Sequence, residues 1–327
     1  MKPFLVAALA VVACNVAGAD LKRGGGPGIG VVEGKVSEWP VPTPLAARDP
    51  APEAGGNIYF SVSKGDKIAR FDSKSKHFKE WNLPAGTKPH GVAVASDGNV
   101  FFAGYGNGTI GELDPRTGAV RPHKTSDPAG GPYSIALDAQ GNVWTTLRAA
   151  GKVAKLDRAT GVVSEYPIDG EPNGLVFDGR GTLWVSRFAA DKLTSLDPRT
   201  GKTTELSTGA GSKPRRLALA PDGVLWVSLY GAGKIISVAV ASNTVVKGYE
   251  LPGGPNSGPY AVNVDASGRV WVVEHQTDSV VIFDPKSEKF QIIRLTGKNL
   301  GVRNATIDPQ GRYWYLGATS GKLGVIE

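Results

Sequence analysis

The chain repeats one pattern seven times, a glycine followed three residues later by an aromatic side chain. The glycines lie 42, 43, 40, 42, 45 and 43 residues apart and are Gly56, Gly98, Gly141, Gly181, Gly223, Gly268 and Gly311. A period near 40 residues with strand-like composition is typical of a β-propeller, in which each repeat forms one blade. We therefore predict an all-β fold, a seven-bladed propeller with four-stranded antiparallel blades.

The third repeat shows how a blade divides into strands. Its strand-like segments cover residues 133–138, 143–146, 152–156 and 162–167. Between the last two, Asp157 can bond its own backbone and Gly161 can accept a positive φ, which favours a tight turn. The aromatic residue of each repeat falls on the second strand, where we expect it to fill the core between blades. No segment shows a sustained helical period.

The two ends of the chain complement each other. The seventh repeat stops at Glu327, just after its third strand, and residues 34–40 match the fourth-strand pattern of residues 161–167. We predict that this N-terminal strand joins the last blade and closes the ring, which removes an unpaired strand edge.

The first residues have the pattern of an export signal. Lys2, an apolar stretch and an Ala17-x-Ala19 cleavage site predict a signal peptide over residues 1–19, and hence a periplasmic or secreted protein. The alternative is a lipobox that would anchor the protein through Cys14, which is the chain's one cysteine and so forms no disulfide within it. Residues 20–30 are predicted to be a flexible leader and residues 31–327 a single propeller domain, with no transmembrane segment after the signal.

The charge balance favours anionic partners. The chain has 37 basic and 30 acidic residues, so removing Lys2 with the signal leaves a net charge of +6. No basic run or stacked-aromatic motif points to nucleic acid. We expect a monomer that binds an anionic small molecule or an anionic protein segment, the alternative being that the charge serves only solubility.

Aligning the seven blades on their repeat glycine indicates which residues lie at the channel mouth. In five repeats a proline nine residues before the glycine marks the start of the innermost strand, and the next residue is the first that can face the channel. This first ring is polar throughout: Arg48, His90, Tyr133, Asn173, Arg215, Tyr260 and Arg303.

A second ring comes four residues after each repeat aromatic, in the loop between the second and third strands. It reads Ser63, Tyr105, Arg148, Phe188, Tyr230, His275 and Ala318. Neither ring contains a carboxylate, although Glu171 and Glu274 lie directly beside them. The two rings therefore predict a cationic ligand site, unless these side chains are only solvated rim residues.

From residue 31 onwards the sequence resembles the virginiamycin B lyases, also called streptogramin lyases, which are seven-bladed propellers. The motifs that carry the resemblance are residues 88–94 (KPHGVAV), 141–144 (GNVW) and 161–167 (GVVSEYP). They are similar to the family's Pro-His/Tyr-Gly-Ile, Gly-x-x-Trp-Phe and Glu-Tyr-x-Leu-Pro patterns. The resemblance implies a carbon–oxygen lyase that opens a cyclic depsipeptide at its ester linkage, by general-base catalysis with Mg²⁺.

The resemblance also implies roles for particular residues. His90 and one of Tyr133 or Tyr260 match catalytic ring positions of the family. His275 stands where the family has a Glu, and Glu171 precedes a proline as another family Glu does. Glu171 and Glu274 are thus the candidates for holding Mg²⁺. The chain departs from the family at Asn173, where a second ring histidine is expected, and at the three ring arginines.

The residues allow two main functions. A lyase-like enzyme would use His90 or His275 as a base near neutral pH, with Tyr133 or Tyr260 as a hydrogen-bond or proton donor. A non-catalytic binding module would hold its ligand by polar contacts from Arg48, Arg148, Asn173, Arg215, Arg303, Tyr105 and Tyr230. A metal-dependent lactonase is a third possibility, but it needs a ring of Glu, Asn and Asp ligands to which only Asn173 corresponds.

Overall fold

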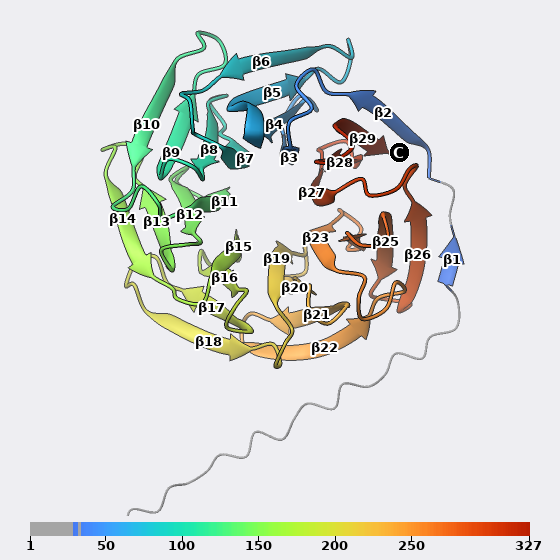
Figure 1. The fold of residues 1–327 in the computed structure, drawn as a ribbon. Helices are drawn as coiled ribbons and strands as arrows, with labels where there is room; N and C mark the ends of the chain where they lie inside the picture. Colours follow the sequence, from blue (N-terminus) through green and yellow to red (C-terminus); the bar gives the residue numbers. More distant parts are fainter. Residues whose placement is uncertain (1–28, 32–33) are drawn as a thin grey trace, which may run out of the picture.

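The computed structural model describes residues 29–31 and 34–327, which form seven β-sheets arranged around a central channel (Figure 1). The prediction of a seven-bladed propeller is confirmed. The predicted signal peptide and most of the predicted leader lie outside the described residues. Within the described part of the chain, no helix has the length and apolar character needed to cross a membrane.

Blades 1 to 4 each run outward from the channel in sequence order. Blade 1 contains β3 (Ala47–Pro52), β4 (Ile58–Val62), β5 (Lys67–Phe71) and β6 (Phe78–Asn82), with the short 3-10 turn η1 (Ser63–Gly65). Blade 2 contains β7 (Pro89–Val94), β8 (Val100–Gly104), β9 (Thr109–Leu113) and β10 (Val120–Lys124). Blade 3 contains β11 (Pro132–Leu137), β12 (Val143–Leu147), β13 (Lys152–Leu156) and β14 (Val163–Pro167). Blade 4 contains β15 (Pro172–Phe177), β16 (Leu183–Arg187), β17 (Lys192–Leu196) and β18 (Thr203–Ser207).

Blades 5 to 7 continue the same order around the channel. Blade 5 contains β19 (Pro214–Leu219), β20 (Val224–Leu229), β21 (Lys234–Ala239) and β22 (Thr244–Glu250). Blade 6 contains β23 (Pro259–Val264), β24 (Val270–Glu274), β25 (Ser279–Asp284) and β26 (Lys289–Arg294). Blade 7 takes β27 (Val302–Ile307), β28 (Tyr313–Gly317) and β29 (Lys322–Ile326) from the C-terminus and β2 (Val36–Pro40) from the N-terminus.

The N-terminal strand closes the ring as predicted. β2 pairs antiparallel with β29, from Val36 opposite Ile326 to Pro40 opposite Lys322. A further short strand, β1 (Ile29–Val31), pairs in parallel with the outer strand β26 of blade 6. Ile29 and Gly30 fall in the predicted leader, which therefore ends in a strand. The N-terminal segment thus covers the outer edges of two neighbouring blades (Figure 1).

The hydrophobic core is divided among the contacts between neighbouring blades. Each of seven apolar clusters combines residues of two adjacent blades, and the one between blades 3 and 4, for example, joins Trp144 and Val153 to Leu183 and Val185. A sheet with two apolar faces can bury both only by packing between two neighbours. This arrangement explains why the core needs nothing from the channel, whose walls are free to carry polar groups.

The repeat tryptophans also fix the turn in front of them. Trp144 donates its indole N–H to Asp138 at 3.0 Å, and Trp314 donates to Asp308 at 2.7 Å. Trp184 and Trp271 make the same contact to the Asp six residues before them. The Asp carboxylate in turn accepts backbone N–H groups of the turn that contains the repeat glycine. The predicted role of these tryptophans in the core is confirmed by their near-complete burial.

Candidate functional site

All seven inner strands carry a β-bulge where they reach the channel mouth. In blade 3, Pro132 pairs with Leu147 and Ile135 with Thr145, so two residues oppose one. The same shift occurs in the other six inner strands, one residue later in blade 1 than elsewhere. Such a bulge redirects side chains from the sheet face. It explains how each blade can present a polar residue at the mouth without burying it between blades.

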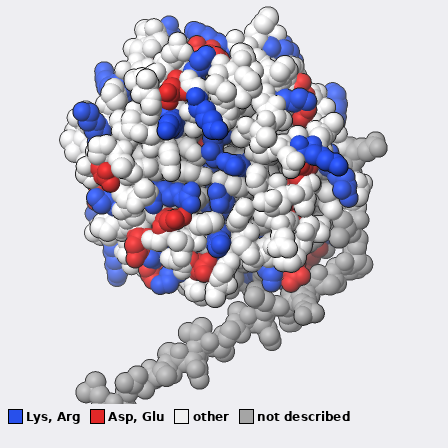
Figure 2. All heavy atoms as spheres, in the orientation of Figure 1, with Lys and Arg blue, Asp and Glu red and all other residues white. Residues whose placement is uncertain are grey.

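The second predicted ring lies against the first. The ring centroids of His90 and Tyr105 are 5.2 Å apart, and the Arg148 guanidinium lies 5.5 Å from the Tyr133 ring centroid. On the other side of the mouth, the Tyr260 ring lies 5.7 Å from that of His275. The structure therefore brings residues from both rings together at one end of the channel. Figure 2 shows Lys and Arg side chains from several blades near the middle of the face it presents.

Two tyrosines meet at the centre of the mouth. The phenol oxygens of Tyr133 on β11 and Tyr260 on β23 are 2.9 Å apart, and each residue is only 3% exposed. The Arg215 guanidinium lies 3.7 Å from the centroid of the Tyr260 ring and donates a hydrogen bond to its oxygen. Arg215 also lies over Phe188 and Tyr230, at 5.0 Å and 4.9 Å. Aromatic faces stabilise a guanidinium by cation–π attraction and hold it in place.

A buried carboxylate, Asp49, organises the layer beneath the ring. Its oxygens lie 3.3 Å from Arg48 Nε, 3.2 Å from Arg216 Nη2 and 3.4 Å from His90 Nδ1. Asn304 donates to it at 2.8 Å. Burial by itself raises the pKa of Asp49, but Arg48, His90 and Arg216 outweigh burial and hold that pKa well below its usual range. Asp49 is therefore an anion that joins blades 1, 2, 5 and 7 across the channel.

Asp49 adopts an unusual backbone conformation, with a φ of 49°. Asp and Asn tolerate this left-handed region better than other side chains, because their short polar groups can bond locally. It is followed by Pro50, which has no backbone N–H to give to the neighbouring strand. Asp49 and Pro50 are the two residues of the displaced bulge in blade 1, and the Asp49 carboxylate lies 3.2 Å from Arg216.

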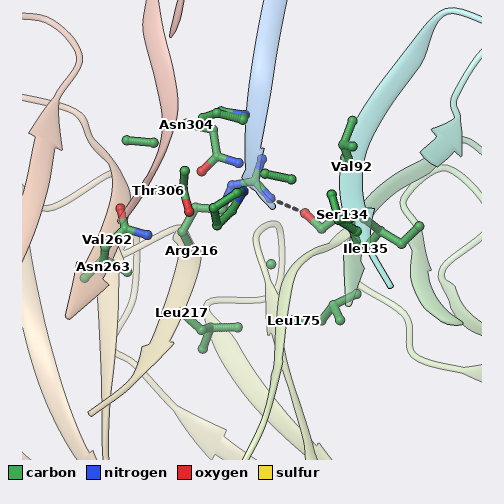
Figure 3. A pocket seen from close by; sticks show the side chains of 18 of the residues that line it. Val92, Ser134, Ile135, Leu175, Arg216, Leu217, Val262, Asn263, Asn304 and Thr306 are labelled. Carbon is green, nitrogen blue, oxygen red and sulfur yellow. Dashed lines mark hydrogen bonds between the residues drawn. The ribbon is translucent and has the colours of Figure 1, made fainter. Parts of the chain in front are cut away.

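A cavity of about 380 Å³ occupies the channel beyond the Asp49 layer (Figure 3). Its polar side chains are those of Ser134, Arg216, Asn263, Asn304 and Thr306, and Arg216 donates a hydrogen bond to Ser134. The rest of the wall is apolar and includes Val92, Ile135, Leu175, Leu217 and Val262. The layer around Asp49 and Arg216 thus separates this chamber from the tyrosine-lined mouth.

The two candidate histidines have different environments. His90 is 6% exposed, packs 4.3 Å from the Tyr133 ring, and has its pKa lowered to about 4, chiefly because burial disfavours the charged form. His275 is half-buried and its Nδ1 lies 2.8 Å from the carbonyl oxygen of Val302. Its pKa is also lowered, first by burial, with Arg303 and Arg215 adding to the effect. Both imidazoles are therefore neutral near pH 7.

The tautomer of His275 follows from its partner. A carbonyl oxygen can only accept a hydrogen bond, so Nδ1 carries the hydrogen and Nε2 keeps its lone pair. Nε2 has no hydrogen-bond partner among residues 34–327. His275 can thus accept a proton at Nε2 without breaking the contact that orients it.

The two glutamates do not form a metal site. Glu171 is bound to Arg148 at 2.7 Å, whereas Glu274 is 1% exposed and accepts from Gly253 N, at 2.8 Å, and from Ser279 Oγ, at 3.2 Å. Mg²⁺ requires several oxygen ligands around one point. In the described part of the chain, no three His, Cys, Asp or Glu side chains are grouped so that they could hold a metal ion. The residues present therefore do not fit the Mg²⁺ site that the resemblance implies.

The remaining ring residues differ in how they are held. Asn173 is fully buried, and neither its amide nitrogen nor its amide oxygen has a hydrogen-bond partner in the described structure. Arg303 is half-buried, and its charge acts on His275. Tyr230 receives a hydrogen bond from Gln276 at 3.3 Å. An unpartnered buried amide is unusual in a folded protein, so the hydrogen-bonding capacity of Asn173 is left unused by the described residues.

Sequence reasoning missed the layer that connects the ring. Asp49, Arg216 and Asn304 each follow a ring residue by one position, and the equivalent residues of the other blades are Gly91, Ser134, Gly174 and Ala261. Charged or amide groups at positions otherwise occupied by small residues were the available signal. Reading the repeat one residue further would have found them.

Comparison with known proteins agrees with this architecture. A solved streptogramin B lyase superposes with a TM-score of 0.83 at 22% identity, over 89% of this chain and 97% of that one. Virginiamycin B lyase from Staphylococcus aureus superposes with a TM-score of 0.83 at 18% identity, over 90% and 99% of the two chains. A chain of the mitotic checkpoint complex reaches 0.77 at 12% identity, over 97% and 98%. At these identities the likeness shows the fold alone.

The family assignment comes from sequence. No curated protein matches the chain in sequence. The model of the virginiamycin B lyase family matches residues 28–179 and 86–327, which together include all seven blades. The chain therefore belongs to the virginiamycin B lyase family.

Proposed function

We propose that the chain is a lyase-like enzyme that acts on an anionic small molecule containing an ester or lactone linkage. The observation that carries this proposal is the environment of His275. Its Nδ1–H is held by the Val302 carbonyl, its Nε2 has no partner among the described residues, and its pKa is lowered, so the imidazole is a neutral base at pH 7. His275 lies beside Tyr260 and Arg215 in the mouth.

The arginines of the mouth supply the complementary charge. Arg215 is held between aromatic rings at 3.7–5.0 Å, and Arg148 is held by Glu171 and lies 5.6 Å from Phe188. A fixed guanidinium can bind a carboxylate and can stabilise negative charge that develops on a carbonyl oxygen. Because these groups are already positioned, little reorganisation is needed when a ligand binds.

The reaction follows from these roles. His275 Nε2 takes the proton from the carbon next to the substrate carbonyl, and the electrons of that C–H bond form a carbon–carbon double bond. The bond between the β-carbon and the ester oxygen breaks, and the ester oxygen leaves as a carboxylate. Arg215 stabilises the enolate-like charge during this step. No water enters the products, which distinguishes the elimination from hydrolysis.

His90 has a supporting role in this proposal. It lies next to Asp49 and Tyr133, and its low pKa makes it a weak base. We assign it to holding Tyr133 and the Asp49 layer in position. Of the two histidines named from the sequence, the surroundings thus favour His275 as the base.

The test is turnover by the His275→Gln variant. Purified protein is incubated with a panel of anionic β-acyloxy esters and lactones, and product is followed by the ultraviolet absorbance of its conjugated double bond. We expect kcat to fall by about 10²–10⁴-fold, the usual contribution of a general base. His77→Gln, at an exposed histidine outside the mouth, is the matched control. Undiminished turnover by His275→Gln would refute the assignment.

A second candidate function is a non-catalytic binding module. The observation that favours it is Asn173, whose buried and unpartnered amide could recognise a ligand without reacting with it. This function requires anion binding that weakens with salt and depends on Arg48, Arg148, Arg215 and Arg303, with no product formed. Calorimetry of an anionic ligand combined with mass spectrometry of the mixture distinguishes the two functions, since only the lyase releases an unsaturated product.

We also propose that the protein acts as a monomer in the periplasm or outside the cell. The sequence of residues 1–19 supports export, with lipid anchoring through Cys14 as the alternative. No step of the proposed reaction uses Mg²⁺, because the described donors do not fit it. Mass spectrometry of the mature protein would show whether it begins at Asp20 or at a lipidated Cys14.

A further inference from the structure

The tyrosine pair at the mouth has two hydroxyl hydrogens, but the described residues provide an acceptor for only one of them. The oxygens of Tyr133 and Tyr260 are 2.9 Å apart, so one hydroxyl donates to the other. The Tyr260 oxygen also accepts from Arg215, which can only donate. Whichever tyrosine donates within the pair, the hydroxyl hydrogen of the other has no acceptor among residues 34–327. A buried hydroxyl without an acceptor is unfavourable, and loss of that one proton removes the conflict.

The charges around the pair favour the same outcome. Arg215 contacts Tyr260 directly, and the Arg216 guanidinium lies 5.4 Å from the Tyr133 ring and 6.0 Å from the Tyr260 ring. Arg48 also acts on both tyrosines. Against these three cations, the layer beneath the pair supplies one carboxylate, Asp49, which is already bound to Arg48 and Arg216.

The other described neighbours of the pair do not supply a negative charge that would balance these three cations. Arg148 lies over Tyr133 and is balanced by Glu171. His90 packs on Tyr133 and His275 on Tyr260, and both histidines are neutral at pH 7. The remaining aromatic neighbours are Tyr105 and Tyr230. One further negative charge would therefore be stabilised at this point.

We propose that Tyr133 and Tyr260 ionise as a pair at mildly alkaline pH, where they share one negative charge and form a second proton acceptor in the mouth, with Tyr260 as its catalytic residue. Burial favours the neutral phenol, but Arg215, Arg48, Arg216 and the hydrogen bond from Tyr133 outweigh burial and lower the pKa of Tyr260 to about 8. Burial and the charge on Tyr260 raise the pKa of Tyr133. The Tyr133 hydroxyl thus donates to the Tyr260 oxygen.

The chemical role of the pair rests on the proposed function, whereas its charge does not. In the elimination, the proton of the substrate carbon moves to the Tyr260 oxygen and makes a neutral phenol. The C–H electron pair forms the double bond, and the ester oxygen leaves as a carboxylate. The phenol then returns its proton to solvent. A tyrosinate held by Arg215 lies beside His275 and would thus act on a substrate whose proton lies nearer to the Tyr260 oxygen than to His275 Nε2.

The experiment measures tyrosinate directly, without a substrate. The ultraviolet difference spectrum of the full chain is titrated from about pH 6 to about pH 11. We expect one tyrosine to ionise near pH 8, well before the others. Tyr260→Phe should remove this step, and Arg215→Gln and Tyr133→Phe should each move it upward by about one unit or more. Tyr166→Phe, on the outer strand β14, is the matched control and should leave the step unchanged.

Two results would overturn the proposal. One is that no tyrosine of the wild type ionises below the ordinary range; the other is that the early step survives in Tyr260→Phe. Thermal unfolding of each variant shows that it is folded, and Arg215→Gln keeps both tyrosines should Tyr260→Phe fail to fold. An early tyrosinate without any lyase turnover would refute the proposed function and leave the shared charge standing. Turnover that depends on His275, with no tyrosine ionising early, would refute the shared charge and leave the proposed function standing.

Discussion

The two ends of the central channel are built from the same seven strands and have different chemistry. At the mouth, arginine, tyrosine and histidine side chains surround the buried Asp49. At the other end, a chamber of about 380 Å³ is lined by aliphatic side chains, a few amide and hydroxyl groups and the Arg216 guanidinium that it shares with the Asp49 layer (Figure 3). The backbone path is shared, so the difference comes from the residues at the bulged positions. A repeated scaffold can thus hold a dense charge network at one end of the channel, while Arg216 is the one charged side chain that the described lining of the chamber contains.

The largest expected effect tests the charge network at the mouth. Asp49→Asn keeps the shape of the side chain but leaves Arg48 and Arg216 buried without a counter-charge. Breaking a buried ion pair in this way costs about 3–5 kcal/mol of unfolding free energy. Thr306→Val in the opposite chamber removes one hydroxyl and should cost less than about 1 kcal/mol. Urea unfolding measures the loss of unfolding free energy in each variant. Similar losses in Asp49→Asn and Thr306→Val would contradict the expected difference between the two ends of the channel.

A second effect concerns acid stability. The unfolded chain protonates His90 near its ordinary pKa of 6.5, but the folded chain protonates it only near 4. As the pH falls from 6.5 to 4, only the unfolded state gains this proton, so the unfolding free energy falls by roughly 3 kcal/mol. Asp49, whose pKa is also lowered by folding, adds a further loss at still lower pH.

The His90→Gln variant isolates this contribution. Its unfolding free energy should change less between pH 6.5 and pH 4 than that of the wild type, because the titrating group is absent. His77→Gln, at an exposed site, should keep the wild-type dependence. Chemical denaturation at a series of pH values provides the measurement. An unchanged slope in His90→Gln would show that burial of this histidine is not what makes the mouth acid-sensitive.

The smallest expected effect concerns anion binding. Arg215→Gln should weaken the binding of acetate or inorganic phosphate by at least about tenfold, since a hydrogen bond to a charged group contributes about 1.5 kcal/mol or more. The Thr306→Val variant should bind as the wild type does, because its hydroxyl lies in the other chamber. Isothermal titration calorimetry at low and high salt gives both affinities. Equal affinities in wild type and Arg215→Gln would place the anion site elsewhere.

Much of the fold could be predicted because its information is local and repeated. The Gly-x-x-aromatic spacing fixed seven blades, and the likeness of residues 34–40 to 161–167 located the closing strand. The predicted strand limits in the third repeat differ from the observed ones by at most one residue, since the end of a strand depends on its partner. The pairing of β1 with β26 was missed because a three-residue strand has no periodicity to detect.

The site was predictable in outline only. The alignment of the blades on their repeat predicted that one end of the channel holds Tyr133, Arg215, Tyr260 and His275, because equivalent positions of a repeat occupy equivalent places. It gave no indication that Asp49 would meet Arg216, 167 residues later. It also treated His90 and His275 as equals, although burial separates them. Contacts between blades depend on side-chain lengths across the channel, which no single repeat specifies.

The sequence by itself determined the architecture, the closure of the ring and the set of polar residues at its mouth. These follow from spacing, turn chemistry and alternation, which act within one blade or between neighbours. Only the tertiary structure decided which of those residues meet and what protonation each adopts. The Tyr133–Tyr260 contact joins blades 3 and 6, and the Asp49 layer joins four blades. The pKa of a buried group is set by such neighbours and by its burial, and both exist only once the ring has closed.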